Sequence, residues 1–143
     1  MALDLGSKRI GVAISDPTAT LARTLTVIQR KKLAVDIAAI AQVVRAEAAE
    51  RVVVGLPLSL TGEVGPQARL TFEFKEVLQK SLDVPVVTWD ESFSTKSAER
   101  ILQAQGVRGR RQRARIDATA AAFILQTYLD SLDMRSVTER EMP

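Results

Sequence analysis

The hydrophobic residues of this chain keep a strand-like spacing over the first 29 or so residues and then begin to alternate between helical and strand-like spacing, which limits the folds available to it. Up to about residue 29, apolar side chains alternate with small or polar ones, which is typical of β-strands. Turn-forming residues separate three such segments, so we expect a three-stranded antiparallel meander. The three predicted strands are Met1–Leu5, Ile10–Asp16 and Thr24–Gln29.

The rest of the chain alternates between helical and extended segments. The run of β-branched residues at 51–55 is typical of a strand buried on both faces, and parallel strands need crossover helices between them. The pattern therefore predicts an α/β fold in which the meander and two parallel strands form a mixed five-stranded sheet flanked by helices. These two strands are predicted at Arg51–Gly55 and Pro85–Trp89, and the helices at Lys32–Glu50, Gln67–Leu82, Ser94 or Thr95 to about Gln105, and Ile116 to about Leu132.

The length of 143 residues suits one domain, which we place at residues 1–133, and we expect a frayed or disordered tail over residues 134–143. The first residues lack the basic and apolar regions of a signal peptide. The longest apolar stretch, Ala118–Leu125, is far shorter than the ~20 residues of a membrane-spanning helix. We therefore expect a soluble, cytoplasmic protein without a membrane partner.

The sequence contains neither cysteine nor histidine. Their absence excludes disulfides, thiolate nucleophiles, Ser-His-Asp triads and zinc sites built from Cys or His. Any chemistry must therefore use carboxylates, hydroxyls, lysine and arginine.

Three acidic residues stand beside segments that are predicted to be buried. Burying a carboxylate costs free energy unless it is paired or binds a cation, and all-oxygen ligation favours Mg²⁺ or Mn²⁺. Two such ions ~4 Å apart can activate a water and stabilise the leaving oxygen in phosphodiester hydrolysis. The three acids are Asp4 in the first strand, Glu91 just after a parallel strand, and Asp117 at the start of the last helix.

Each acid also has a structural interpretation, and spacing alone leaves the choice open. Asp4 could hydrogen-bond the turn that follows it, and Asp117 could be an ordinary acid at a helix start. Asp90 competes with Glu91, because adjacent residues of a strand point to opposite sides. Asp16, before Pro17, is typical of a turn.

Arginine is concentrated in one short segment that contains no acidic residue. Without these arginines, the 20 Lys and Arg residues of the chain would no longer outnumber its 17 Asp and Glu residues. The segment is either a contact for a phosphate backbone or a solvated basic loop. Its arginines are Arg108, Arg110, Arg111, Arg113 and Arg115.

Several ordered motifs resemble the YqgF family, also called RuvX, whose members are described as Holliday junction resolvases or pre-16S rRNA nucleases. The similarity runs from Leu3 to about Asp130. The motifs are Leu3–Ala13, Val54–Leu58, Gly62–Pro66, Trp89–Thr95 and Ile116–Ala121.

The resemblance implies an RNase H-like fold and a catalytic, metal-binding set of Asp4, Glu91 and Asp117, which favours Glu91 over Asp90. It implies one or two Mg²⁺ or Mn²⁺ ions as cofactor. Family members commonly carry Arg and Leu after the Asp-Glu pair, where this chain has Ser92 and Phe93. The residues expected to contact nucleic acid are Lys8, Arg9, Ser94, Thr95, Arg108, Arg110, Arg111, Arg113 and Arg115.

Two activities follow from the resemblance, and both need the same hydrolytic chemistry. One is maturation of the 5′ end of the 16S rRNA precursor, which we take as the main hypothesis. The other is cleavage of four-way DNA junctions, for which a symmetric homodimer is expected. With few aromatic residues available for base stacking, a structured or duplex substrate fits better than a single strand. The alternative from another class is a nucleic-acid-binding module without catalysis.

Overall fold

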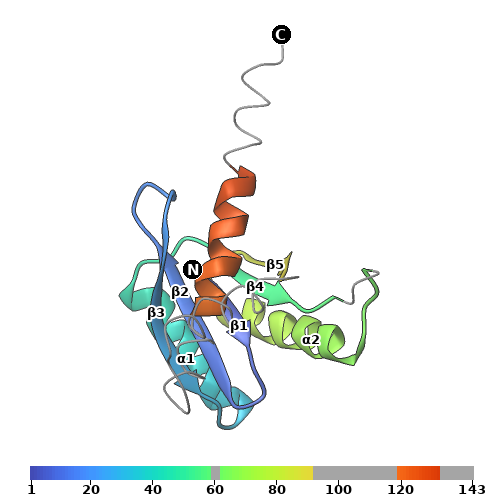
Figure 1. Cartoon of the computed structure of the whole chain (residues 1–143). Helices are drawn as coiled ribbons and strands as arrows, with labels where there is room; N and C mark the ends of the chain where they lie inside the picture. The colour runs from blue at the N-terminus through green and yellow to red at the C-terminus, as the bar shows by residue number, and fades with distance from the viewer. Residues whose placement is uncertain (59–61, 92–118, 133–143) are drawn as a thin grey trace, which may run out of the picture.

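The computed structural model describes residues 1–58, 62–91 and 119–132. Its centre is a five-stranded sheet with the strand order β3-β2-β1-β4-β5 (Figure 1). The predicted mixed sheet of a meander and two parallel strands is therefore confirmed. The strands are β1 (Ala2–Leu5), β2 (Arg9–Ser15), β3 (Ala22–Gln29), β4 (Val52–Leu56) and β5 (Val86–Asp90).

The pairing of the strands decides which of their ends lie together. Strands β1, β2 and β3 pair antiparallel, whereas β1 pairs parallel with β4 and β4 parallel with β5. The carboxyl ends of β1, β4 and β5 therefore meet at one edge of the sheet. In open α/β sheets this edge is where ligands bind.

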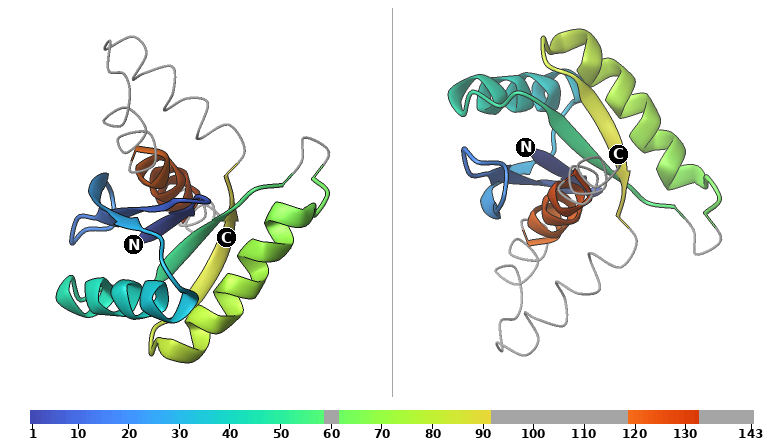
Figure 2. Two further views of the ribbon diagram at one scale, coloured as in Figure 1. Left: turned by 90° about the horizontal axis from the view of Figure 1, so that it is seen from below. Right: turned by 90° about the horizontal axis from the view of Figure 1, so that it is seen from above.

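Helices cover both faces of the sheet, as the two views of Figure 2 show. The helices α1 (Leu33–Ala46) and α2 (Pro66–Ser81) lie on one face, and a helix over residues 119–132 lies on the other. Each face has its own apolar cluster. On the α1 and α2 side the cluster includes Leu3, Ile10, Val12, Ile40, Val54, Phe74 and Leu78, and on the other side it includes Ala2, Ala13, Val53, Ala121, Ile124, Leu125 and Leu129.

The helix boundaries differ from the sequence prediction by a few residues. The first helix ends at Ala46 because Ala48 takes a positive φ of 51°, and the amides of Glu47, Ala48 and Ala49 bond back to carbonyls of the last turn. The second helix begins at Pro66, whose fixed φ suits a first helical position.

Some predictions lie outside the described residues. These are the helix from Ser94 or Thr95 to Gln105, the start of the last helix at Ile116, and the tail over 134–143. In the part of the chain that the structure describes, no helix has the length and apolar character needed to cross a membrane.

Candidate active site

The first strand carries Asp4 to the edge where the parallel strands end. Side chains alternate along β1, so Asp4 shares the face of Ala2, which the 119–132 helix covers, while Leu3 is buried on the opposite face. Asp4 lies opposite Gly11 of β2 in the antiparallel register, so its neighbour on the β2 side has no side chain. Asp4 is half-buried at this edge.

Glu91 follows β5 and reaches the same place from the other side of β4. Its backbone N–H donates to the Leu56 carbonyl at 3.2 Å, which continues the β4–β5 ladder past Asp90. Trp89 packs on the 119–132 side, and alternation places Glu91 on that side too, whereas Asp90 is exposed. The Glu91 side chain forms a hydrogen bond with Asp4. The structure thus brings Asp4 and Glu91 together, although they are 87 positions apart in the sequence.

Gly55 creates the space that the Glu91 carboxylate occupies. Leu3 pairs with Val54, so Asp4 and Gly55 are side by side at the ends of β1 and β4. A Cβ on Gly55 would lie 2.6 Å from Glu91 Oε2 and 2.6 Å from Ile124 Cδ1. A residue with a side chain could therefore not stand here unless Glu91 or Ile124 moved.

The environment of Glu91 favours its neutral form. Burial raises the pKa of the Glu91 carboxyl, the nearby charge of Asp90 raises it further, and the hydrogen bond from Asp4 acts in the opposite direction. Glu91 Oε2 is buried and has no hydrogen-bond partner among the residues that the structure describes. Burying a carboxylate oxygen without a partner costs free energy, and a cation bound between the two carboxylates would offset that cost.

The donor set fits a hard divalent cation. Carboxylate oxygens are the ligands that Mg²⁺ and Mn²⁺ prefer, and Asp4 and Glu91 supply them from two rigid strand ends. Within residues 1–58, 62–91 and 119–132, no group of three or more acids could hold a metal. The third predicted ligand, Asp117, lies outside the described residues, as do Ser94, Thr95 and the five arginines from Arg108 to Arg115.

Lys8 and Arg9 lie on the turn that joins β1 to β2, next to Asp4. The Gly6 amide donates to the Arg9 carbonyl at 2.8 Å and closes this turn. A Cβ on Gly6 would meet the Arg9 carbonyl oxygen at 2.7 Å, so the turn needs glycine. Lys8 is exposed and Arg9 is half-buried.

Asp16 serves its own loop at the opposite end of the sheet. Its carboxylate accepts hydrogen bonds from Thr18 Oγ1 at 2.7 Å and from the amides of Thr20 and Leu21 at 2.8 and 3.1 Å. These bonds, that of Thr18 first, lower the pKa of Asp16. The structure therefore favours the turn interpretation of Asp16.

A cavity of about 660 Å³ also lies at that opposite end. Its lining includes Met1 at the start of β1, Asp16 after β2, Arg51 before β4, and Leu132. Neither Asp4 nor Glu91 lines it. This cavity and the paired acids are therefore separate features of the molecule.

Replacing Gly55 by alanine tests the geometry of the pair. The new methyl group would displace both the Glu91 carboxylate and the end of the fully buried Ile124 side chain, and such overpacking costs about 1–3 kcal/mol. The Glu91 carboxylate would move away from Asp4, and a displacement of about 1 Å can cost about 10²-fold in rate. We expect Gly55→Ala to fold with a lower Tm than wild type and to lose about that much catalytic activity when it is assayed well below its unfolding temperature. An unchanged rate would show that Glu91 need not occupy this space.

Sequence reasoning missed Gly55 as a determinant of the site. The residue stood at the end of a predicted buried strand, and the only signal was a glycine where a β-branched residue would fit the run. Its importance depends on Glu91 and Ile124, which are distant in sequence.

The chain is similar to several known proteins over most of its length. A family model described as "RuvX: Holliday junction resolvase" matches residues 1–131. A protein of Caldanaerobacter subterraneus subsp. tengcongensis named "Putative pre-16S rRNA nuclease" is 47% identical over 134 residues, which are 92% of this chain and 95% of the relative. A Moorella thermoacetica protein of the same name is 44% identical over 137 residues, covering 96% of this chain and 98% of the relative. The solved structure of T. thermophilus RuvC in complex with Holliday junction substrate has a TM-score of 0.55 at 18% identity, covering 92% of this chain and 93% of that one, and shares the fold.

Proposed function

The chain belongs to the RuvX (YqgF) family of Holliday junction resolvases, and from this membership we propose that it is a divalent-metal-dependent endonuclease acting on the 16S rRNA precursor. The family membership and the names of the relatives support nuclease activity. The observation that carries the metal dependence is the Asp4–Glu91 pair, with its buried, unpartnered Glu91 oxygen.

Asp4, Glu91 and Asp117 are the residues that would hold Mg²⁺ or Mn²⁺. When bound, the metal supplies an activated water and stabilises the charge on the leaving oxygen. Asp4 and Glu91 extend from the ends of packed strands, so little ordering is needed for them to bind. Glu91 must lose its proton to act as a ligand, and burial of its carboxyl opposes that loss in the metal-free protein.

The chain's own basic residues would bind the substrate. We assign to Lys8 a contact with a phosphate beside the carboxylate pair, and its exposure on the turn after Asp4 supports this assignment. We assign the same role to Arg9, Ser94, Thr95 and the arginines between 108 and 115. Arginine forks match phosphate geometry, which supports the assignment of the arginine segment.

The substrate class is supported by the relatives. Those reported above are both named for pre-16S rRNA, and such an activity fits a cytoplasmic protein. Cleavage of four-way DNA junctions is the second candidate, which the description of the family favours. Paired incisions in a symmetric junction would require a homodimer, so the oligomeric state of the protein on each substrate separates the two candidates.

The deciding experiment is cleavage of a labelled panel of substrates. It contains a 16S precursor fragment, a four-way DNA junction, duplex DNA and single-stranded RNA, with Mg²⁺ or Mn²⁺. We expect cleavage of the precursor fragment near its 5′ end, complete loss of cleavage with EDTA, and recovery when metal is returned. Asp117→Asn should abolish cleavage while leaving binding of the fragment intact. Preferred cleavage of the junction would select the second candidate, and binding without cleavage would contradict catalysis.

A further inference from the structure

Asp36 is a buried acid that the proposed chemistry does not use. Its side chain is 1% exposed, and it lies in the first turn of α1. Oδ1 accepts a hydrogen bond from the Lys31 amide at 2.8 Å. Within the described part of the chain, Oδ2 has no hydrogen-bond partner, but it lies 3.6 Å from Nε of Arg30, with which it forms an ion pair. A charge held this far from water calls for a physical reason.

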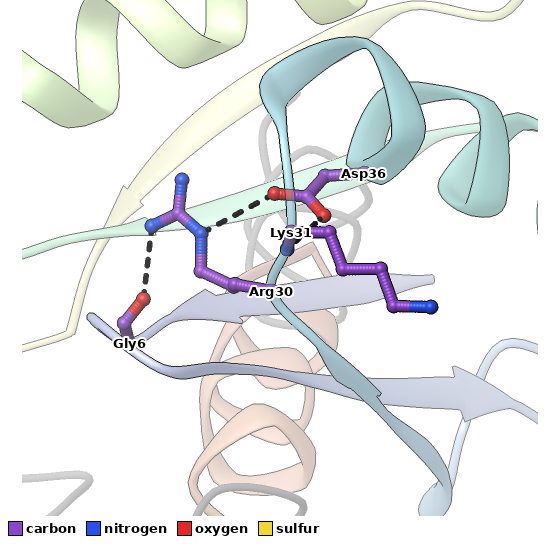
Figure 3. A network of polar contacts seen from close by, with 4 residues as sticks. All are labelled: Gly6, Arg30, Lys31 and Asp36. Atoms are coloured by element: carbon purple, nitrogen blue, oxygen red, sulfur yellow. Dashed lines mark hydrogen bonds and ion pairs between the residues drawn. The ribbon is translucent and has the colours of Figure 1, made fainter.

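Arg30 connects Asp36 to the turn that follows Asp4. Its Nη1 donates to the Gly6 carbonyl at 2.9 Å, and its own amide donates to the Lys8 carbonyl at 2.9 Å. Figure 3 shows the guanidinium between the Asp36 carboxylate and Gly6. The guanidinium carbon also lies 5.6 Å from the centre of the Phe74 ring, so α2 contacts it as well.

Stability alone is a weak explanation for this arrangement. A buried ion pair gains about as much from attraction as it loses through desolvation, and uncharged replacements are often as stable. What the pair does provide is direction, because the guanidinium fork can bind two groups at once in a fixed geometry. Here the two groups are Asp36 and the carbonyl of Gly6, two residues after Asp4.

We propose that Arg30 and Asp36 are positioning residues that hold the Gly6–Arg9 turn, and through it the Asp4 carboxylate, in the geometry that binds the metal. Asp36 orients Arg30, Arg30 holds Gly6, and the closed turn fixes the end of β1. The proposal rests on the proposed metal-dependent function. It adds two residues that contact neither metal nor substrate.

The test separates positioning from stability by removing the charges together. In the double variant Arg30→Met/Asp36→Asn, the amide oxygen of Asn can still accept the bond from Lys31, and Met fills much of the arginine volume. Metal binding is measured without nucleic acid, by titrating Mn²⁺ and following the fluorescence of Trp89, the only tryptophan, two residues before Glu91. We expect a Tm close to wild type, an Mn²⁺ affinity about tenfold weaker, and a lower cleavage rate at saturating substrate.

Two further variants complete the test. Arg30→Lys keeps a positive charge beside Asp36 but lacks the fork, so we expect it to retain the wild-type Tm and still lose metal affinity. It also keeps the test informative if the double variant does not fold. Asp16→Ala is the matched control, because it removes a carboxylate that organises a turn at the opposite end of the sheet. We expect it to lower Tm without changing the Mn²⁺ affinity.

The outcomes separate this inference from the function on which it rests. Wild-type metal affinity and cleavage rate in folded Arg30→Met/Asp36→Asn or Arg30→Lys would overturn the positioning role and leave the nuclease assignment intact. A wild-type protein that binds no Mn²⁺ or Mg²⁺ would contradict both.

Discussion

Glu91→Gln is expected to abolish cleavage and, at the same time, to stabilise the metal-free protein at neutral pH. Transition-state stabilisation by bound metal ions amounts to several kcal/mol, and at about 1.4 kcal/mol per tenfold its loss corresponds to at least about 10³-fold in rate. Gln has the shape of Glu, so the position beside Gly55 and the hydrogen bond with Asp4 can be kept. What disappears is the cost of an ionised group in a buried place.

The stability difference should depend on pH in one direction. Burial raises the pKa of Glu91 in the folded protein above the 4.5 of a free glutamate, so the folded state holds this proton more tightly than the unfolded state. The contribution of Glu91 to stability is therefore fully present below pH 4.5 and is lost as the pH rises through the folded-state pKa. Below pH 4.5 wild type and Glu91→Gln should have similar stability. Above the folded-state pKa of Glu91 the variant should be the more stable of the two.

Bound metal should act in the opposite direction, because it should stabilise wild type more than Glu91→Gln. A ligand that binds only the folded state raises its stability, and Glu91→Gln lacks one of the proposed ligands. Thermal unfolding is therefore measured with EDTA and with saturating Mg²⁺, from below pH 4.5 to neutral pH. We expect the variant to have the higher Tm in EDTA and wild type to gain more from Mg²⁺. Asp90→Asn, at the exposed neighbour of Glu91, is the matched control and should keep cleavage. A Glu91→Gln variant that still cleaves would refute the assignment of Glu91.

Ile124→Ala is expected to cause a large loss of stability. Ile124 is 0% exposed and belongs to the apolar cluster that joins the 119–132 helix to the sheet. This cluster contains several alanines and few large side chains, so each large one carries much of the packing. Removing a buried isoleucine to alanine costs about 2–5 kcal/mol, and the upper part of that range applies where neighbours cannot close the cavity.

The substitution Ile124→Ala should also affect the candidate site. The Cδ1 atom of Ile124 lies against Gly55, as the Glu91 carboxylate does. We expect urea unfolding to report a lower midpoint with an unchanged slope, and cleavage below the unfolding temperature to fall too. Ile124→Val, which removes one methyl group, should cost about 0.5–1.5 kcal/mol. Equal stability of Ile124→Ala and wild type would show that the helix is not anchored through this residue.

The element order was predictable because it depends on local pattern. Alternating residues over Ile10–Asp16 and the β-branched run at 51–55 describe strands wherever they occur in a chain, and the helix-spaced residues between them require a crossover. Ends of elements were less accurate. The first helix was expected to reach Glu50, and it ends at Ala46 because the backbone turns at Ala48, a non-glycine residue with positive φ that gave no signal in the sequence.

The candidate site was only partly visible in the sequence. Composition directed attention to carboxylates, because histidine and cysteine are absent. Asp4 and Glu91 became candidates because they lie in or just after predicted buried strands. The assignment of Asp117 and of the arginine segment still depends on the family resemblance. The choice between Glu91 and Asp90 also needed more than spacing, because a shift of one residue reverses the face on which a side chain lies.

The sequence by itself determined the order of the described strands and helices and the exclusion of histidine and cysteine chemistry, and it supplied a short set of candidate acids. Only the tertiary structure decided that Gly55 leaves space for Glu91, that Ile124 closes it, and that Asp36 acts on Gly6 through Arg30. The physical reason is the separation along the chain over which each kind of interaction acts. Periodicity and turn chemistry act between neighbours in the chain, whereas close approach, burial and electrostatic pairing act between residues that meet only when the sheet has formed and its helices have packed on it.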